Sequence, residues 1–445
     1  MPAQFHILTF GCQMNKSDSE RARGLLLSAG MTETEDWENA DFILFNTCSV
    51  RQTAEDRVYG MMTGIRDLKI KNPKLITGLM GCMAGRDKDG AIKARLPWID
   101  LFFPTQEMVH LPRWISEMNP LLVDTATGEE YNDYFAIQPR YTATFQAFVT
   151  IGTGCNKFCA YCVVPAARGL QKDRPAKDII AEVRALAEKG CLEITLLGQT
   201  VNWYRPKDPE TFSPANPLNT NRGNYFGALL WELNQIEGIE RIHWTAPHPV
   251  HMTPEVITAL SLPKQVNFLH LPVQAGNNEI LKRMNRPYTS EFYIDLVHKI
   301  KAAKPDIALG TDIIVGFCGE SDSAFEETLA MYRECQFDIS YNAMYSPRSH
   351  TKAQETMKDD VSKIEKKQRW NILHELMKEI VLAKNQQYID KTVSVLVDTF
   401  ANGMCQGNSS EMKRIHFRGD EGMRGTIQSV RIDRVLEWTL YGSLT

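Results

Sequence analysis

The sequence predicts an α/β protein in three parts: an N-terminal parallel α/β domain, a partial TIM-like (β/α)6 barrel and a small all-β barrel. Three observations support this prediction. Strand-like and helix-like stretches alternate to about residue 345, a polar, turn-rich segment (DTATGEEYNDY) interrupts them, and only short alternating segments follow the last long helix. We therefore expect domains at 1–120, 146–380 and 381–445, with a linker at 121–145.

The first part contains three strand-like stretches, HILTFGC, ADFILFNTC and KLITGLMGC. A helix is predicted after each strand. The stretch SDSERARGLLLSAG has Ser17 and Glu20 at capping-box spacing and Gly30 as a terminator. Ser49 and Gln52 have the same spacing before a second helix, and DGAIKARL predicts a short third one. This alternation indicates a parallel sheet with covered faces.

The second part contains six strand candidates, AFVTI, EITLL, RIHWT, NFLHL, IALGTDIIV and DISYN. Helical patterns separate them, as in DIIAEVRALAEKG, which ends at Gly190. Active sites of such barrels lie at the carboxyl ends of the strands. A Pro- and Asn-rich insert, WYRPKDPETFSPANPLNTNRGNYF, follows the second strand and predicts a long functional loop at this rim.

The third part has short alternating segments, TVSVLVDTF, KRIHFRG, GTIQSVRID and LEWTLYGSL, which predict a β-barrel of about sixty residues. Acidic side chains nearly balance its basic ones, so the residues alone favour a solvated, charge-mixed surface over an RNA-binding one. The basic and aromatic candidates are Lys413, Arg414, His416, Phe417, Arg418, Arg424, Arg431 and Arg434.

The composition of the chain limits its possible partners and its cellular compartment. The formal net charge of −4 does not by itself indicate a nucleic-acid partner, although a local basic surface would suffice for one. No apolar run is long enough to span a membrane, and we expect no secretory signal and a cytoplasmic location. Because thiols stay reduced in that compartment, the ten cysteines indicate metal binding before disulfides.

The strongest local signal is Cys155, Cys159 and Cys162 in GTGCNKFCAYC, directly after the first barrel strand. Soft thiolates at this spacing can converge on an iron–sulfur centre. Three ligands without a fourth leave one coordination position free, as catalysis at a metal requires. The alternative is a zinc site, but no His, Cys or Asp follows within ten residues of Cys162.

A second trio, Cys12, Cys48 and Cys82, is scattered in the sequence, but each cysteine ends a predicted parallel strand. Carboxyl ends of neighbouring strands form one crevice, so the three thiols are expected to meet. Any one of them alone is better explained as a buried cysteine; the set favours a second site. The other four, Cys191, Cys318, Cys335 and Cys405, are interpreted as core or incidental residues.

Several motifs together resemble one family. They are TFGCQMN, NTCSVRQTAEDRVYG, GTGCNKFCAYC, LLGQTVN, HLPVQAGNNEILKRMNRPYT, TDIIVGF and YSPR. The cysteine loop resembles the radical S-adenosylmethionine (radical SAM) superfamily, and the three parts in this order resemble its methylthiotransferase family of the MiaB type. The resemblance runs from Ile7 to Leu444, and the C-terminal barrel resembles a TRAM domain, an RNA-binding module.

This resemblance implies two 4Fe–4S clusters and S-adenosylmethionine as cofactors. Cys155, Cys159 and Cys162 would hold the radical-generating cluster, and Cys12, Cys48 and Cys82 an auxiliary cluster that carries the sulfur to be donated. Cofactor contacts are expected from rim residues after the barrel strands. The candidates are Gln199, Asn202 and Asp312, for which the alternative is a satisfied loop hydrogen bond.

The reaction that the resemblance implies uses two molecules of S-adenosylmethionine. One methylates the auxiliary sulfur; the other yields methionine and a 5′-deoxyadenosyl radical, which removes hydrogen from adenine C2 before the methylthio group is attached. The implied partners are the anticodon stem-loop of tRNA, a reductant such as flavodoxin or ferredoxin, and an iron–sulfur carrier protein; no membrane is implied.

NTCSVRQTAEDRVYG favours N6-isopentenyladenosine as the substrate. The related alternatives are threonylcarbamoyladenosine in tRNA and an aspartate of a ribosomal protein; a non-catalytic two-cluster electron carrier is a remote one. Four positions depart from the usual family pattern, which has Glu, Ser, Pro and Gly where this chain has Gln171, Asp173, Cys318 and His350. The first two place the contacts to S-adenosylmethionine in doubt.

Overall fold

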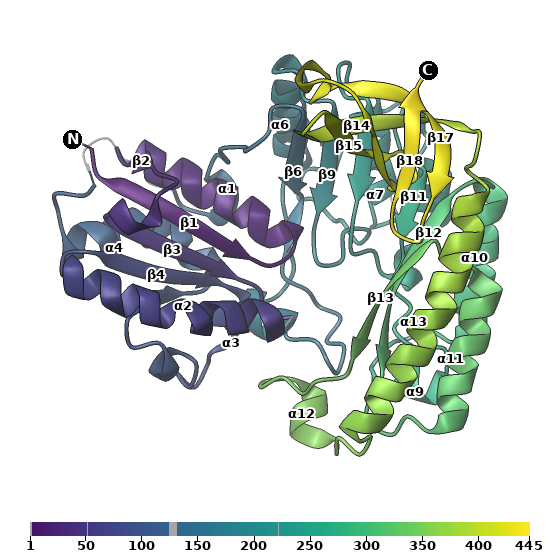
Figure 1. The fold of residues 1–445 in the computed structure, drawn as a ribbon, viewed down its shortest axis with the longest axis horizontal. Coiled ribbons are helices and arrows are strands. Elements are labelled where there is room, and N and C mark those ends of the chain that lie inside the picture. The colour runs from purple at the N-terminus through teal and green to yellow at the C-terminus, as the bar shows by residue number, and fades with distance from the viewer. Residues whose placement is uncertain (1, 51, 124–130, 221) are drawn as a thin grey trace.

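The computed structural model describes residues 2–50, 52–123, 131–220 and 222–445. Its sheets confirm the predicted fold class: an N-terminal parallel sheet, a six-stranded partial barrel and a closed C-terminal barrel. The N-terminal sheet lies beside the partial barrel, and the C-terminal barrel sits at one end of it (Figure 1).

The N-terminal sheet is wholly parallel, with strand order β2-β1-β3-β4-β5. Helices α1 (Gln13–Ser28) and α4 (Leu111–Met118) cover one face, and α2 (Gln52–Lys71) and α3 (Cys82–Arg86) cover the other. Successive side chains of a strand point to opposite faces of the sheet. Because helices cover both faces, the central strands are mostly apolar. The strands are β1 Gln4–Phe10, β2 Thr32–Glu33, β3 Phe42–Thr47, β4 Ile76–Gly81 and β5 Leu101–Phe103.

The predicted capping box at Ser17 and Glu20 is wrong, because α1 begins earlier, at Gln13. Both residues are buried inside the helix and contact the barrel side instead, with Ser17 Oγ 3.0 Å from Thr150 Oγ1 and Glu20 accepting from Thr142. Cys12 takes the N-cap position. Ser17, expected to cap the helix, therefore lies inside it and contacts the neighbouring domain.

Two further helix starts differ from prediction. Helix α2 does begin at Gln52, but the Ser49 hydroxyl donates to Glu55 and makes no cap hydrogen bond among the described residues; position 51 lies outside them. The stretch DGAIKARL forms only the short 3-10 turn Lys93–Arg95. Eight residues between tight turns are too few to propagate a stable α-helix.

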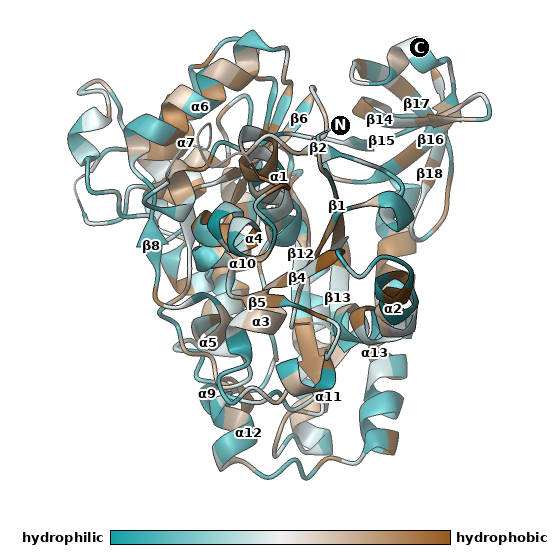
Figure 2. Ribbon diagram, turned by 90° about the vertical axis from the view of Figure 1, so that its left-hand side faces the viewer, coloured by the Kyte–Doolittle hydropathy of each residue, from teal (hydrophilic) through white to brown (hydrophobic). Residues whose placement is uncertain are grey.

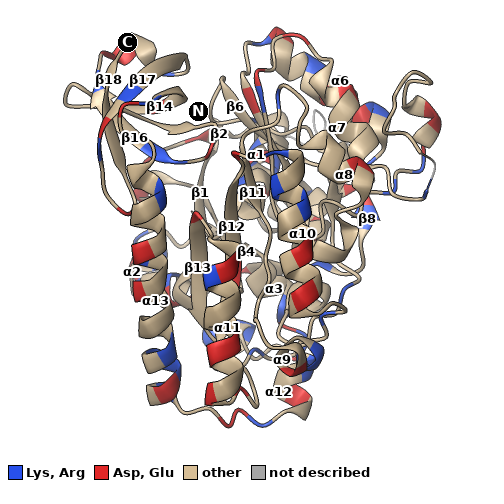
Figure 3. Ribbon diagram, turned by 90° about the vertical axis from the view of Figure 1, so that its right-hand side faces the viewer, with Lys and Arg blue, Asp and Glu red and all other residues tan. Residues whose placement is uncertain are grey.

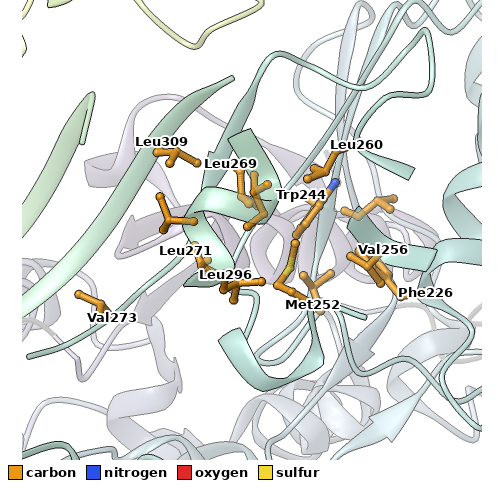
Figure 4. Packing of buried hydrophobic residues seen from close by; sticks show 14 of the residues in the cluster. Phe226, Trp244, Met252, Val256, Leu260, Leu269, Leu271, Val273, Leu296 and Leu309 are labelled. Carbon is orange, nitrogen blue, oxygen red and sulfur yellow. The ribbon is translucent and has the colours of Figure 1, made fainter. Parts of the chain in front are cut away.

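The partial barrel consists of two three-stranded parallel sheets, ordered β10-β9-β6 and β11-β12-β13. A parallel bridge between Ile242 and Gln265 links β10 to the segment before β11. Helices pack outside, and α6 (Ala176–Glu188) buries the predicted apolar face. Figure 4 shows part of the core, where Trp244, Leu269 and Leu309 converge from different strands. The strands are β6 Gln146–Thr150, β9 Glu193–Leu197, β10 Arg241–Trp244, β11 Phe268–His270, β12 Ala308–Val315 and β13 Ile339–Met344.

Further helices complete the outer layer: α7 Phe226–Asn234, α8 Pro254–Ala259, α9 Asn278–Arg283, α10 Ser290–Ala303, α11 Asp322–Cys335, α12 Lys352–Thr356 and α13 Lys363–Gln386. Acidic and basic residues are mixed along α10, α11 and α13 (Figure 3). The loops near β8 (Lys172–Asp173) and α12 are mainly hydrophilic (Figure 2). Among the helices that the structure describes, none combines the length and the apolar character needed to cross a membrane.

The C-terminal barrel closes through five strands in the order β14-β15-β16-β18-β17. Strand β15 was not predicted, because MCQGNS carries Gly and Asn, which are depleted in strands. Arg241 of the partial barrel donates to the carbonyls of Asn408 and Ser409, so the small barrel is seated at the amino ends of the larger barrel's strands. The strands are β14 Thr392–Ala401, β15 Met404–Ser409, β16 Arg414–Arg418, β17 Ile427–Val435 and β18 Leu440–Leu444.

Candidate functional site

Cys12, Cys48 and Cys82 lie together at the carboxyl edge of the N-terminal sheet. Strands β1, β3 and β4 are in register at their last residues, and each cysteine follows one of these ends within two residues. The thiols of Cys12 and Cys48 lie close enough to shift each other's pKa, and Cys82 is close enough to act on both electrostatically. Three thiols far apart in the sequence thus share one place.

The protonation of this trio is uneven. The neighbouring Cys48 thiol lowers the pKa of Cys12 to about 6, and Cys12 in turn raises the pKa of Cys48, because one proton is favoured on the pair and it stays with Cys48. Burial raises the pKa of Cys82. Cys12 also occupies the N-cap of α1, where the helix dipole favours negative charge. One thiolate ligand is therefore available near neutral pH without a metal.

A buried amide network supports this edge from behind. The Asn15 side chain donates to Asn46 Oδ1 at 2.9 Å, and Asn46 donates in turn to the Asn15 carbonyl and to Ser19 Oγ. A Cβ on Gly11 would lie only 2.8 Å from the Cβ of Cys48. The backbone before Cys12 can approach Cys48 only because residue 11 is glycine.

The second trio lies on the loop after β7 (Gly152–Thr153), at the rim of the barrel. The amide of Cys155 donates to the Gly169 carbonyl at 3.1 Å, which closes the loop on itself. The Asn285 side chain donates to the carbonyls of Lys157 and Phe158, and Phe158 adopts a left-handed φ of 49°. The loop is therefore fixed by neighbouring barrel segments and not by its own residues alone.

Two ligand candidates of this loop have polar partners at their sulfur atoms. Cys155 Sγ lies 3.2 Å from Thr200 Oγ1, and Arg286 Nη1 donates to Cys159 Sγ at 3.4 Å. Arg286 is buried, and its other donors hold Tyr288 and the Pro272 carbonyl. Arg286 therefore directs a buried positive charge at the sulfur of Cys159.

A cationic and aromatic group borders the same rim. Trp203 stacks on His251 with ring centroids 4.2 Å apart, and Lys157 and Arg205 lie over the Trp203 ring at 5.3 and 4.9 Å. Neighbouring His248 is 4% exposed, and neither of its ring nitrogens has a hydrogen-bond partner among the described residues. Burial lowers its pKa to about 2, so its ring is neutral.

The three predicted cofactor contacts differ in what they already bind. Gln199 Oε1 is buried without a partner in the described part of the chain, so it is free to accept a hydrogen bond from a ligand. The Asn202 side chain is fully buried; it donates to the His248 carbonyl and accepts from the His248 backbone N–H. Asp312 Oδ1 lies 3.2 Å from His270 Nε2. Of the three, Gln199 is the one with a buried acceptor that has no partner among the described residues.

The positions that depart from the family pattern have local roles. Gln171 donates to Asp173 and to the Trp203 carbonyl, and Asp173 accepts from the Arg205 amide, which braces the cationic rim. His350 has φ of 63°, a left-handed conformation that suits the usual glycine better. Cys318 is fully buried in the core, next to Tyr345.

The two trios fit 4Fe–4S clusters by the chemistry of their donors. Each supplies three thiols, and each has a buried arginine donating to one sulfur. No group of three His, Cys, Asp or Glu side chains within the described ranges is drawn together tightly enough for one metal ion. In a cluster each thiolate binds a different iron atom, so its ligands stand further apart than those of a single ion.

Sequence reasoning missed both arginines, Arg168 and Arg286. Arg168 ends helix α5 (Val164–Arg168), and its Nε donates to Cys82 Sγ at 3.2 Å. Helices α3 and α5 pack so closely that a Cβ on Gly85 would come within 2.1 Å of the Ala167 carbonyl oxygen. No sequence pattern connects Arg168 with Cys82, 86 residues earlier.

Three of the eight candidate RNA-binding residues of the C-terminal barrel are engaged in contacts within the protein. Phe417 is in the core, Lys413 pairs with Asp338, and Arg414 pairs with Asp398. A different surface combines cations and rings: Lys367 lies 4.1 Å over Trp370, which stacks on His374 at 4.6 Å, and His374 faces Trp438 of the β17–β18 turn at 6.0 Å. We call Lys367, Trp370, His374 and Trp438 the aromatic strip.

Comparisons with known proteins agree with this architecture. Residues 149–332 match the model described as Radical SAM superfamily, and residues 4–104 match Uncharacterized protein family UPF0004. The chain is 41% identical to a tRNA-2-methylthio-N(6)-dimethylallyladenosine synthase of Thermoanaerobacter sp. (strain X514), covering 99% of this chain and 92% of the relative. It is 40% identical to a protein of the same name from Geobacillus kaustophilus (strain HTA426), covering 99% and 82%.

A solved structure shares the fold at low identity. The radical S-adenosylmethionine methyltransferase TsrM from Kitasatospora setae, with cobalamin and a [4Fe-4S] cluster bound, superposes with a TM-score of 0.56 at 12% identity. The match covers 91% of this chain and 81% of that one. At this identity the likeness concerns the arrangement of helices and strands alone.

Proposed function

The chain belongs to the tRNA-2-methylthio-N(6)-dimethylallyladenosine synthase family of radical SAM methylthiotransferases, and from this premise we propose its reaction and its site. It adds a methylthio group to C2 of N6-isopentenyl (dimethylallyl) adenosine beside the anticodon of tRNA. Its cofactors are S-adenosylmethionine and two 4Fe–4S clusters. One observation carries the proposal: α5, which begins two residues after Cys162, packs on α3, which begins at Cys82, and Arg168 of α5 donates to the Cys82 sulfur.

We assign Cys155, Cys159 and Cys162 to the radical-generating cluster and Cys12, Cys48 and Cys82 to the auxiliary cluster. When bound, the first supplies the electron that cleaves S-adenosylmethionine to a carbon radical, and the second presents the sulfur to be transferred. The chain supplies charge and geometry. The cationic Arg286 at Cys159 and the hydroxyl of Thr200 at Cys155 orient and stabilise two of the thiolates.

The rim residues suit the groups of S-adenosylmethionine that must be held. Lys157 and Arg205 place positive charge beside Trp203, where a carboxylate would be favoured. Gln199 Oε1 has unused capacity to accept from an amine or a hydroxyl. Asp312, whose side chain is 38% exposed, offers a second acceptor, and Asn202 acts as a positioning residue through His248. Holding the reactants in fixed positions lowers the barrier, because the entropy of bringing them together is lost on binding and not in the reaction step.

RNA recognition is assigned to the aromatic strip together with the C-terminal barrel. Bases that are splayed out of an RNA loop stack on exposed rings, and neighbouring cations attract the phosphates. Trp438 is 45% exposed, and Arg434 lies 4.0 Å over Tyr441 on the adjoining strands β17 and β18. The domain division that fits this assignment is 1–120, 146–380 and 381–445, with the linker at 121–145.

The remaining partners follow from the chemistry. We propose a one-electron reductant such as flavodoxin or ferredoxin for reductive cleavage, and an iron–sulfur carrier protein as the source of clusters. We assign the protein to the cytoplasm, where thiol ligands stay reduced.

The decisive test is nucleoside mass spectrometry of tRNA from a strain that lacks the gene. We expect 2-methylthio-N6-isopentenyladenosine to disappear while its unmodified precursor accumulates, and a plasmid copy to restore it. If the methylthio nucleoside were unchanged in the deletion strain, the proposed substrate would be wrong, and the ribosomal-protein aspartate would become the next substrate to examine.

A further inference from the structure

Arg168 belongs to the loop of one cysteine trio and contacts a sulfur of the other. Its backbone belongs to the radical-cluster loop, because α5 follows Cys162 directly and the next residue, Gly169, accepts the amide of Cys155 at 3.1 Å. Its side chain crosses to the N-terminal sheet, where Nε donates to Cys82 Sγ at 3.2 Å. The loop that holds one trio therefore ends in a cation directed at a sulfur of the other.

The orientation of this guanidinium is fixed by a buried acid. Arg168 is 3% exposed, and its Nη2 donates to Asp18 Oδ2 at 2.5 Å. Asp18 is fully buried on α1 and also accepts from the Tyr134 hydroxyl at 2.7 Å. The arginine backbone is held as well, since Gln106 donates to its carbonyl at 2.6 Å. Little freedom remains to move Nε away from Cys82.

From this geometry we propose that Arg168 is a positioning residue of the auxiliary site that also tunes its reduction potential. The proposal rests on the assignment of the auxiliary cluster to Cys12, Cys48 and Cys82. Hydrogen bonds to ligand sulfur and nearby positive charge favour the reduced, more negative form of an iron–sulfur cluster and raise its potential. Asp18 opposes this charge while it aims the donor.

If Arg168 tunes the reduction potential, two variants should shift that potential in opposite directions, which a purely structural contact would not do. Removing the cation with Arg168→Gln should shift the auxiliary potential to more negative values. Removing the neighbouring negative charge with Asp18→Asn leaves the cation unopposed and should shift the potential to more positive values. Arg168→Lys retains the charge but not the planar fork, so its shift should be smaller than that of Arg168→Gln.

The experiment uses full-length protein in which Cys155, Cys159 and Cys162 are replaced by Ala, so that only the auxiliary cluster contributes a signal. Anaerobic reconstitution should give about four irons per chain, and EPR-monitored potentiometric titration then measures the potential of each variant. Arg241→Lys in this background is the matched control, since this buried arginine pairs with Glu193 at the amino ends of the barrel strands; the potential should not move.

The outcomes separate this inference from the proposed function. If the parent protein bound no four-iron cluster, the assignment of the auxiliary site would fail. If it bound four irons and the potential were the same in Arg168→Gln and Asp18→Asn, or moved in the same direction, the role of Arg168 would be overturned. Should Arg168→Gln fail to fold, because Asp18 is left buried and unpaired, the sign of the Asp18→Asn shift decides the matter alone.

Discussion

The backbone amide of Cys48 donates to the carbonyl of Phe10 at 2.8 Å, so the pairing of β1 with β3 continues into the auxiliary site. A ligand candidate thus has its main chain fixed by the sheet before any metal binds. The scaffold and not the cluster sets where Cys48 stands, and its thiol can be removed without disturbing the strand ladder.

The first prediction concerns Cys48→Ala. The protein should hold about four irons where the unchanged protein holds about eight, because one of two four-iron clusters loses a ligand. It should still form 5′-deoxyadenosine from S-adenosylmethionine but yield no methylthiolated tRNA. Iron analysis and chromatography of the reaction products measure both. Cys191→Ala, at a buried thiol that donates to the Glu193 carbonyl, is the control and should retain both clusters. Methylthiolation by Cys48→Ala would contradict the assignment.

The second prediction is the reciprocal one. Cys159→Ala removes the sulfur that Arg286 contacts and should abolish 5′-deoxyadenosine formation while leaving about four irons on the chain. Product analysis after incubation with dithionite and S-adenosylmethionine gives the answer. Cys335→Ala, in the core beside Met331, is a suitable control with normal cleavage expected. Persistent deoxyadenosine in Cys159→Ala would exclude this trio as the radical-generating site.

The third prediction uses two helical glycines. A Cβ at Gly85 would lie 2.1 Å from the Ala167 carbonyl oxygen, whereas a Cβ at Gly60 in α2 meets nothing within 4 Å. Gly85→Ala should therefore lower the free energy of unfolding by about 1–3 kcal/mol through overpacking. Gly60→Ala should raise it by about 0.5–1 kcal/mol, since alanine is the better helix former. Urea unfolding of both variants checks this; equal effects would mean that α3 and α5 are not in close contact.

These contacts indicate how far sequence reasoning could go. The strands and their cysteine ends were predictable, because burial on both faces leaves apolar runs and parallel strands end at one edge. The prediction for Ser17 was wrong because its three-residue spacing from Glu20 fits a capping box, whereas its contact with Thr150 leaves no pattern in the sequence. Arg168 and Trp438 carried no local signal, since their partners Cys82 and His374 are 86 and 64 residues away and meet them only after folding.

The fourth prediction concerns the aromatic strip. Trp438→Ala should weaken the affinity for the unmodified tRNA by about tenfold, because one base–aromatic stack contributes about 1–3 kcal/mol. Filter binding or fluorescence anisotropy with the anticodon stem-loop measures it. Ile372→Ala is the matched control, because Ile372 is an exposed apolar side chain without a π-face on α13, the helix that carries Trp370 and His374; it should leave the dissociation constant unchanged.

The contribution of charge to this surface can be separated from stacking. Lys367→Ala should weaken binding and also reduce the slope of log affinity against log salt by somewhat less than one unit, as expected for one lost phosphate contact. Trp438→Ala should leave that slope as it is. If both variants bound the stem-loop as tightly as the unchanged protein, the strip would not be part of the RNA-binding surface.

The last prediction concerns acid stability. His243 on β10 is 4% exposed, neither ring nitrogen has a partner among the described residues, and burial lowers its pKa to about 3. Below about pH 6.5 the unfolded chain binds a proton that the folded chain does not, so folding stability falls as pH decreases from 6.5 toward 3, by up to about 1.4 kcal/mol per pH unit. His243→Asn removes the part of this dependence that comes from His243.

Urea unfolding of the metal-free chain between pH 7.5 and 4.5 tests this, because cluster loss in acid then plays no part. The difference in unfolding free energy between the unchanged protein and His243→Asn should move steadily in favour of the variant as pH falls. His298→Asn, at an exposed histidine paired with Glu334, is the control and should give a curve closer to that of the unchanged protein. Parallel curves for His243→Asn and the unchanged protein would mean that His243 becomes protonated in the folded barrel, and that water reaches this part of its interior.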